Sequence, residues 1–231
     1  MARRKGVDRN GRRPRQGYLR RQENTRNQRK LAIVACEGTE TEPNYLNRLF
    51  DALKRDQLLS RESCVIADHH HTDPLGVLND LLSHETPLGL THKDYEHAWI
   101  VIDRDPERTD GGGHTRQSFN AAIEKTKRVK PAVKIAWSNP CFEIWFLLHF
   151  EYRNTAIDRN ELYGLITNRL GKKYKKSDKE IYALLEDRLE TAIRNANNLQ
   201  KQAIDRGLVP ADTNPGTTVH DLIIELRRIQ K

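Results

Sequence analysis

The chain has 231 residues, of which 36% are hydrophobic and 31% are charged, and its formal net charge is +8. This length is typical of one domain or of one domain with an appendage, and the high charged fraction indicates that part of the chain does not pack into a core. No stretch approaches the roughly 18–20 apolar residues of a membrane span, and the N-terminus is too charged for a signal peptide, so we expect a soluble, cytoplasmic protein without a membrane partner.

The positive charge is concentrated in residues 1–30, which hold twelve Lys or Arg residues against Asp8 and Glu23, a net charge of +10. This basic arm has few apolar side chains and no periodic pattern, so we predict that it is disordered when free. Its side chains can bind nucleic acid by neutralising phosphates, and a solubilising tail without a partner is the alternative. The arginines that we assign to this contact are Arg12, Arg13, Arg15, Arg20 and Arg21.

From residue 31 onward, short apolar runs alternate with helical patterns, which predicts βα units on a parallel sheet. The predicted strands cover residues 31–36, 64–67, 98–102 and 133–137, and the predicted helices begin at Pro43 and Pro74 and include 118–127. The expected fold is therefore α/β, with an open, mainly parallel sheet of about four strands flanked by helices. We assign this domain to residues 31–150 and expect residues 151–231 to form a helical extension packed on it.

The cysteines and a run of histidines invite a metal interpretation that the pattern does not favour. Cys36, Cys64 and Cys141 are odd in number and each lies in an apolar segment, so we interpret them as small buried side chains. Successive residues of an extended chain point to opposite sides, so the adjacent histidines 69–71 do not converge on one ion. We therefore predict neither a disulfide framework nor a zinc site.

Acidic residues follow two of the predicted strands at their carboxyl ends, where open parallel sheets bind ligands. Glu37 follows the first strand, and Asp103 and Asp105 follow the third. In an extended Asp-x-Asp sequence both side chains point to the same side, with Cα atoms about 7 Å apart. Such hard oxygen ligands suit Mg²⁺ or Mn²⁺, and clustered carboxylates repel one another unless a cation neutralises them. Helix caps or surface turns are the alternative for each residue alone.

Three motifs resemble the RloB family, namely CEGTETEPNYL at residues 36–46, SNPCFEIWFLLHF at 138–150 and NPGTTV at 214–219. Glu37-Gly38 after one strand and Asp103-Arg-Asp after another are similar to the Toprim fold of primases, type II topoisomerases and OLD-family nucleases. The resemblance implies a Toprim-like, metal-dependent nuclease that cuts DNA or RNA in a prokaryotic defence or abortive-infection system. It also implies a partner ATPase of the AAA or ABC type.

Carried over to this chain, the resemblance implies that Glu37, Asp103 and Asp105 are catalytic, with Glu37 as general acid or base. It implies Mg²⁺ or Mn²⁺ as cofactor, with the ligands Glu37, Glu42, Asp103, Asp105 and Glu143. We prefer Glu42 to Glu40 as a ligand because a role as helix cap is enough to explain Glu40. Glu143 can equally be an acidic residue in a first helical turn, where the helix dipole favours it.

Further along the chain, a basic run surrounds Tyr174 and suits a surface that binds a nucleic-acid backbone, although a solvated turn explains it equally well. Its members are Lys172, Lys173, Lys175 and Lys176. Arg104 and Lys134 are further candidates for a phosphate contact. His149 is more simply a hydrogen-bonded histidine at a helix end than a general base.

Two other functions are compatible with the same residues. The first is a non-catalytic Toprim-like module that senses nucleic acid or nucleotide and regulates a partner ATPase. The second is nucleotidyl transfer, which the lack of a zinc module disfavours. The chain has no G-x-x-x-x-G-K-[ST] motif, so any ATP dependence comes from another protein. The sequence is compatible with a homo-oligomer and does not distinguish DNA from RNA, including tRNA.

Overall fold

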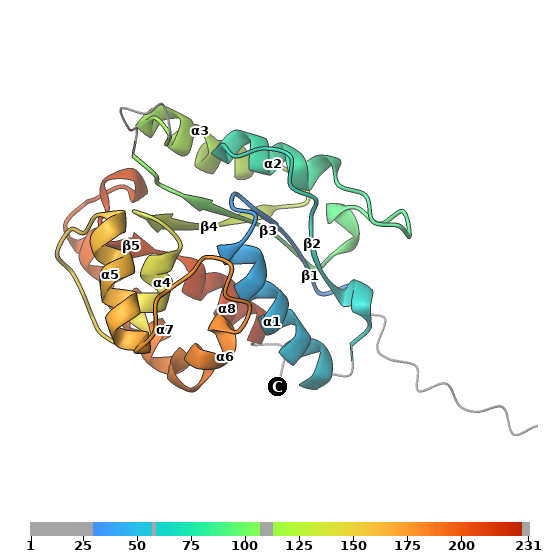
Figure 1. Ribbon diagram of the computed structural model, residues 1–231. Coiled ribbons are helices and arrows are strands. Elements are labelled where there is room, and N and C mark those ends of the chain that lie inside the picture. The colour runs from blue at the N-terminus through green and yellow to red at the C-terminus, as the bar shows by residue number, and fades with distance from the viewer. Residues whose placement is uncertain (1–29, 57–58, 107–112, 228–231) are drawn as a thin grey trace, which may run out of the picture.

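The computed structural model describes residues 30–56, 59–106 and 113–227, and these are built around a five-stranded sheet. The strands are β1 (Ala32–Cys36), β2 (Cys64–Ile66), β3 (His97–Asp103), β4 (Val133–Asn139) and β5 (Gly216–Thr217). Their order in the sheet is β2-β1-β3-β4-β5, and only β5 is antiparallel to its neighbour (Figure 1). The predicted α/β class with a mainly parallel sheet is confirmed. The short strand β5 was not predicted, because two residues are too few for a periodic pattern.

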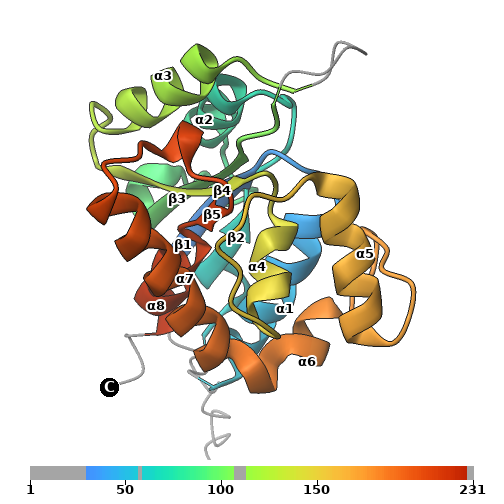
Figure 2. The same ribbon diagram turned by 90° about the vertical axis from the view of Figure 1, so that its left-hand side faces the viewer.

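Helices cover both faces of the sheet (Figures 1 and 2). One face carries α2 (Pro74–Ser83) and α3 (Arg116–Thr126). The other carries α1 (Thr41–Asp56), α4 (Glu143–Leu148), α5 (Arg159–Leu170), α6 (Ile181–Leu185), α7 (Leu189–Asp205) and α8 (Val219–Arg227). Short 3-10 helices complete the described elements at Arg61–Ser63, His92–Asp94, Glu186–Arg188 and Pro210–Asp212. Residues after 150 thus supply four of the helices and one strand of the sheet.

The apolar run of β1 explains why the sheet has a core on each side. Ile33 and Ala35 pack in the core beneath α2 and α3, whereas Val34 and Cys36 pack in the core beneath α1 and α4. Adjacent side chains of a strand point to opposite faces, so a strand covered on both faces is apolar at every position. The uninterrupted apolar sequence of β1 therefore agrees with a strand whose two faces are both covered by helices.

The starts of two helices place the residues of the later site. Asp73 caps α2, and its carboxylate accepts the backbone N–H groups of Leu75 and Gly76 at 3.1 and 3.0 Å, as the Asp-Pro pair predicts. The prediction for α1 was wrong by two residues, since the helix begins at Thr41 rather than at Pro43. The first N–H groups of a helix have no acceptor within it, so proline is tolerated at the third position.

Several other predictions can be located in the structure. All three cysteines are free and buried, as predicted. No helix of the described residues is both long enough and apolar enough to cross a membrane. The basic arm lies outside the described residues apart from Lys30, and so do the five arginines assigned to nucleic acid.

Candidate active site

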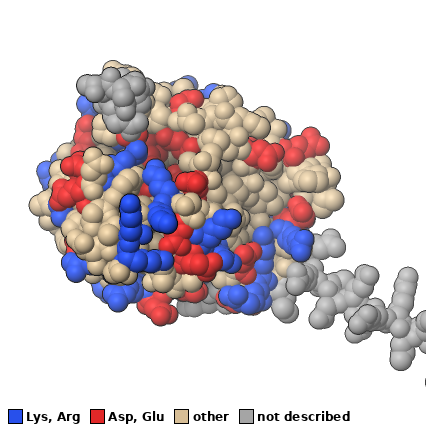
Figure 3. Space-filling model, in the orientation of Figure 1, with Lys and Arg blue, Asp and Glu red and all other residues tan. Residues whose placement is uncertain are grey.

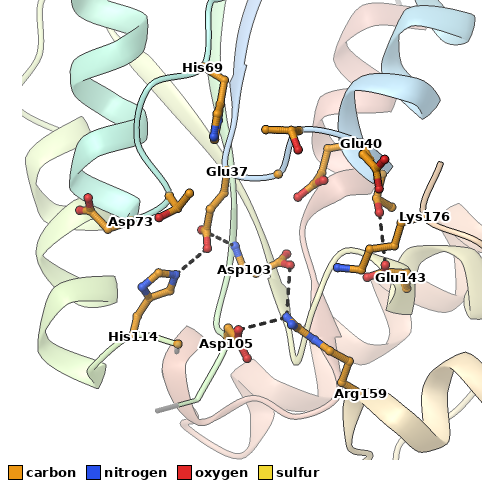
Figure 4. A pocket seen from close by; sticks show the side chains of 16 residues that line it. Glu37, Glu40, His69, Asp73, Asp103, Asp105, His114, Glu143, Arg159 and Lys176 are labelled. Carbon is orange, nitrogen blue, oxygen red and sulfur yellow. Dashed lines mark hydrogen bonds and ion pairs between the residues drawn. The ribbon is translucent and has the colours of Figure 1, made fainter. Parts of the chain in front are cut away.

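A cavity of about 540 Å³ lies at the carboxyl ends of β1 and β3 (Figure 4). Its lining includes every carboxylate that the sequence assigned to the site, namely Glu37, Glu42, Asp103, Asp105 and Glu143. Glu40 and Asp73 line the cavity as well, so both Glu40 and Glu42 lie at the site. Ligands of open α/β sheets bind at this edge. The structure thus joins side chains from β1, β3, α1 and α4 in one place.

Glu37 follows β1 directly, and both of its carboxylate oxygens have partners. Oε2 accepts the backbone N–H of Asp103 at 3.1 Å, and Oε1 lies 2.5 Å from Nε2 of His114. Burial raises the pKa of Glu37, and the hydrogen bond from His114 opposes that rise. The same hydrogen bond raises the pKa of His114. The two side chains therefore form a hydrogen-bonded pair inside the cavity.

Asp103 is the last residue of β3, and Asp105 lies two positions further. Nη2 of Arg159 is 3.3 Å from Oδ2 of Asp105 and 4.0 Å from Oδ2 of Asp103. Oδ1 of Asp103 is buried without a hydrogen-bond partner among the described residues. Burial, together with repulsion from Glu42 and Glu37, raises the pKa of Asp103 well above its ordinary value. Both aspartates thus lie beside the guanidinium of Arg159, and their predicted role as metal ligands stays a prediction.

Glu42 and Glu143 approach the cavity from helices instead of strands. Glu42 is buried in the first turn of α1, where burial and repulsion from Glu143 and Glu37 raise its pKa from 4.5 to about 7. A Cβ atom at Gly38 would lie 2.3 Å from Oε2 of Glu42, so glycine is needed for this close approach. The position of the Glu42 carboxylate therefore depends on the Glu-Gly turn after β1.

Glu143 lies both at the start of a helix and at the cavity. It is the first residue of α4, and its side chain also lines the cavity. Oε1 of Glu143 accepts the hydroxyl groups of Thr41 at 3.3 Å and Tyr174 at 2.9 Å. The side chain is buried, so these hydroxyls fix its orientation toward the cavity.

Three residues of the site were not recognised in the sequence. His114 follows a Gly-rich segment after the Asp-x-Asp motif, which is a local signal that could have been read. Arg159 and Tyr174 come from the region after residue 150 and give no local signal, because only the packing of α5 brings Arg159 to the cavity and only the turn after α5 brings the hydroxyl of Tyr174 to Glu143. Tyr174, which the basic run surrounds in the sequence, is itself buried, and its hydroxyl donates to Glu143 at 2.9 Å.

The lysines of the basic run differ in position. Lys176 lines the cavity, whereas Lys172 pairs with Asp178 at 2.8 Å, and Lys173 and Lys175 are exposed. In Figure 3, basic and acidic side chains intermix on the face of the molecule that is shown. That face offers no continuous basic surface for a nucleic-acid backbone.

The remaining candidates from the sequence make hydrogen bonds or ion pairs within the protein. His149 is buried with Nδ1 2.8 Å from the carbonyl oxygen of Trp145, and burial lowers its pKa to about 4. Lys134 pairs with Glu225 near the amino ends of the strands, far from a phosphate at the carboxyl edge. Arg104 donates to the carbonyl oxygen of His114 at 2.9 Å and so holds the segment that carries this histidine. The histidines 69–71 do not converge: His71 pairs with Asp80 at 2.5 Å, whereas His69 lines the cavity, with its Nδ1 3.2 Å from the carbonyl oxygen of Cys36 (Figure 4).

The donor set of the cavity suits a hard divalent cation in its chemistry. Its carboxylates outnumber its cationic side chains, and the raised pKa values of Glu37, Glu42 and Asp103 show the cost of burying them together. The buried, unpartnered Oδ1 of Asp103 is a further oxygen free to bind an ion. Within the described part of the chain, however, no three His, Cys, Asp or Glu side chains stand close enough to hold one as they are oriented. The residue types fit the ion, and their side chains would have to turn to reach it.

The chain also matches a family model. Residues 32–226 match the model of the RloB-like protein family, which covers all but the two ends of the chain, and the protein belongs to that family. No curated protein and no solved structure matches the chain.

Proposed function

We propose that this RloB-like protein is a Mg²⁺- or Mn²⁺-dependent nuclease that hydrolyses phosphodiester bonds of DNA or RNA. One observation carries the proposal: carboxylates from two strand ends and two helix starts converge on one cavity at the ligand-binding edge of a parallel sheet. The resemblance to the Toprim fold, in which a Glu and an Asp-x-Asp motif occupy corresponding positions, supports the same assignment.

The charge of the cavity explains why a metal ion belongs to the proposal. A phosphodiester is an anion, and these carboxylates, whose pKa values are already raised by burial and by mutual repulsion, would repel it when ionised. We assign one ion to Glu37, Asp103 and Asp105, and a second to Glu42 and Glu143. A bound divalent cation supplies Lewis-acid chemistry, which activates water and stabilises charge on the attacking and leaving oxygens.

The proton transfer in this mechanism falls to Glu37 and His114. Water attacks phosphorus and loses a proton, the bond from phosphorus to the leaving oxygen breaks, and that oxygen takes up a proton. The hydrogen-bonded pair of Oε1 of Glu37 and Nε2 of His114 lies in the cavity, where it can give a proton to the leaving oxygen and regain one from the attacking water near neutral pH. The backbone N–H of Asp103 fixes the second oxygen of Glu37, so the carboxylate orients the imidazole.

Binding of the polymer is assigned to two regions. Lys176 and Arg159 are the Lys and Arg side chains among the described residues that line the cavity, and they are in place to contact the phosphate that reacts. The basic arm of residues 1–30 supplies the longer, salt-dependent contact with the backbone. The defence role, the cytoplasmic location and a partner ATPase are part of the proposal and rest on the family resemblance.

One observation favours the alternative of a sensing module. Arg159 already neutralises Asp103 and Asp105, and a guanidinium in such a place can hold a phosphate without any hydrolysis. In that case the cavity would bind a nucleotide or a nucleic-acid end, and the chemistry would belong to a partner ATPase.

The deciding experiment measures metal binding and cleavage with the full chain. Wild type, Asp103→Asn/Asp105→Asn and the control Asp221→Asn/Glu225→Gln are titrated with Mn²⁺ by calorimetry and then incubated with labelled DNA and RNA. The control removes two carboxylates from α8, near the amino ends of the strands. We expect saturable binding and cleavage in wild type and control, and neither in the site variant.

Two results would speak against the nuclease. Equal cleavage by the site variant would show that the aspartates do no chemistry. Binding of the nucleic acid without cleavage by any of the three proteins, in the presence of Mn²⁺, would favour the sensing module.

A further inference from the structure

Arg159 occupies the position between the two aspartates that the proposed function gives to a metal ion. It is the first residue of α5, directly after the capping residue Asp158, and its side chain reaches back to the strand ends (Figure 4). Its Nη2 atom lies 3.3 Å from Asp105 and 4.0 Å from Asp103, while the side chain remains 27% exposed. The guanidinium is therefore the counter-ion of the Asp-x-Asp motif in this structure.

The guanidinium is held mainly by those carboxylates. Its Nε atom is buried and has no hydrogen-bond partner among the described residues. The ion pairs of Arg159 with Asp103 and Asp105 both go through the same Nη2 atom, at distances longer than those of a bidentate Arg–carboxylate pair. An arginine held this loosely can leave its carboxylates at a small cost once another cation takes them.

A divalent cation and the guanidinium cannot share the aspartates in this arrangement. Arginine does not lose its proton in proteins, and Mg²⁺ binds carboxylate oxygen at about 2.0–2.1 Å. An ion at that distance from Oδ2 of Asp103 or Asp105 would face the positive Nη2 group across a few ångströms, so like charges would repel. Occupation by metal thus requires Arg159 to move.

We propose that Arg159 is an exchangeable counter-ion: a divalent cation displaces it from Asp103 and Asp105, and the freed guanidinium then binds the phosphate of the nucleic-acid substrate. The inference rests on the metal site of the proposed function. The planar fork of a guanidinium matches two phosphate oxygens, and Arg159 lines the same cavity, so the released side chain needs no new path to reach the substrate. Metal binding and substrate binding are coupled through this one residue.

The coupling predicts effects of opposite sign when Arg159 is replaced. Without the internal cation, the aspartates are free for the metal, so Arg159→Gln should bind Mn²⁺ about tenfold more tightly than wild type. Without the guanidinium, the substrate loses its contact, so the same variant should bind an oligonucleotide about threefold or more weakly when a divalent cation is present. A merely structural role would weaken both or neither.

Arg153 provides a matched control. It is a partly buried arginine from the same region, its Nε atom also lacks a hydrogen-bond partner among the described residues, and it pairs with Glu161 at 2.6 Å outside the cavity. Arg153→Gln removes one positive charge near α5 without touching the aspartates. Arg159→Lys keeps the charge but removes the planar fork.

The experiment uses the full chain of wild type, Arg159→Gln, Arg159→Lys and Arg153→Gln. Calorimetry gives the Kd for Mn²⁺, and fluorescence anisotropy gives the Kd for a labelled single-stranded oligonucleotide at one salt concentration, with Ca²⁺ and with no divalent cation. We expect tighter Mn²⁺ binding only in Arg159→Gln, and weaker Ca²⁺-dependent oligonucleotide binding in both Arg159 variants. If Arg159→Gln fails to fold, Arg159→Lys still tests the phosphate contact, and its unchanged oligonucleotide affinity would contradict the proposal.

The outcomes separate this inference from the function on which it rests. An Mn²⁺ Kd that is the same within twofold in wild type and Arg159→Gln, but lost in Asp103→Asn/Asp105→Asn, overturns the exchange and leaves the nuclease proposal standing. No Mn²⁺ binding by any variant overturns both. Binding by Arg159→Gln alone shows that the wild-type guanidinium holds the aspartates more strongly than Mn²⁺ does, and this result overturns the exchange.

Discussion

The two walls of the cavity hold their negative charge in different ways. The strand wall consists of Glu37, Asp103 and Asp105, whose carboxylates meet the side chains of His114 and Arg159. The helix wall consists of Glu42 and Glu143.

On the helix wall, Glu143 is bonded to the hydroxyl groups of Thr41 and Tyr174, and the pKa of Glu42 rises to about 7. The comparison shows that charge is compensated by cations at the strand ends and by hydroxyl groups and protonation at the helix starts. The strand wall is thus prepared for exchange of cations, whereas the helix wall stores a carboxylate that ionises near neutral pH.

The largest expected effect comes from breaking the hydrogen bond between His114 and Glu37 on the strand wall. His114→Ala should lower the rate of cleavage about 1000-fold, within the range of general acid–base contributions, because the leaving oxygen loses its proton donor. Mn²⁺ affinity should stay within about twofold, since the carboxylates remain. Single-turnover cleavage and calorimetry measure the two quantities.

His71→Ala is the matched control for this variant. His71 lies 2.5 Å from Asp80, the same separation as in the pair of His114 and Glu37, but it lies outside the cavity lining. Cleavage should be nearly unchanged in this control. An equal loss in both variants would show that the effect of His114 is on stability and not on the reaction.

The next effect is the pH dependence of stability that the buried carboxylate of Glu42 causes. The pKa of Glu42 is about 7 in the folded protein against an ordinary 4.5, so the folded state binds more protons between these values and loses stability as pH rises through them. Glu42→Gln removes the buried charge and should raise the free energy of unfolding of the metal-free protein by about 3 kcal/mol at pH 8. The gain should shrink as pH falls to 5.

Urea unfolding at the two pH values measures this difference. Glu124→Gln serves as the control, because its side chain is exposed and should change stability little at either pH. A gain of Glu42→Gln that is the same at pH 5 and pH 8 would show that the carboxylate of Glu42 does not titrate in this range.

A smaller effect should follow when the hydroxyl support of the helix wall is removed. Tyr174→Phe takes away the donor at 2.9 Å from Glu143 and should lower the free energy of unfolding by about 2 kcal/mol, as for hydrogen bonds to charged groups. Tyr182→Phe is the control, since its hydroxyl meets the carboxylate of Glu186 at 3.3 Å outside the cavity. If Tyr182→Phe lowers the free energy of unfolding at least as much, the hydrogen bond between Tyr174 and Glu143 contributes no more than an ordinary one.

The smallest effect concerns the contact between the two walls at Gly38. Gly38→Ala places a methyl group against the carboxylate of Glu42, and we expect a cost of about 1 kcal/mol together with weaker Mn²⁺ binding. Gly164→Ala is the control, because a Cβ there would meet nothing within 4 Å. Thermal unfolding and calorimetry measure both variants, and equal behaviour of the two would show that Glu42 moves aside freely.

Much of the strand wall could be predicted because its determinants are local. An apolar run that ends in Glu37, and another that ends in Asp103, fix both the strands and the edge at which their acidic residues meet, since parallel strands share one carboxyl edge. The helix wall was predicted only through the family resemblance for Glu42 and Glu143. The start of α1 was misplaced because proline fits more than one position of a first turn.

The sequence by itself determined the α/β class, the buried cysteines and the acidic strand ends, because each depends on the period and polarity of a few adjacent residues. Only the tertiary structure decided which side chains meet these acids. His114, Arg159 and Tyr174 act through contacts with residues far away in the chain, and the packing of α5 and of the turn around Tyr174 against the strand edge creates those contacts. No periodic pattern records such a contact, because it depends on the geometry of the packed elements and not on the neighbours in sequence.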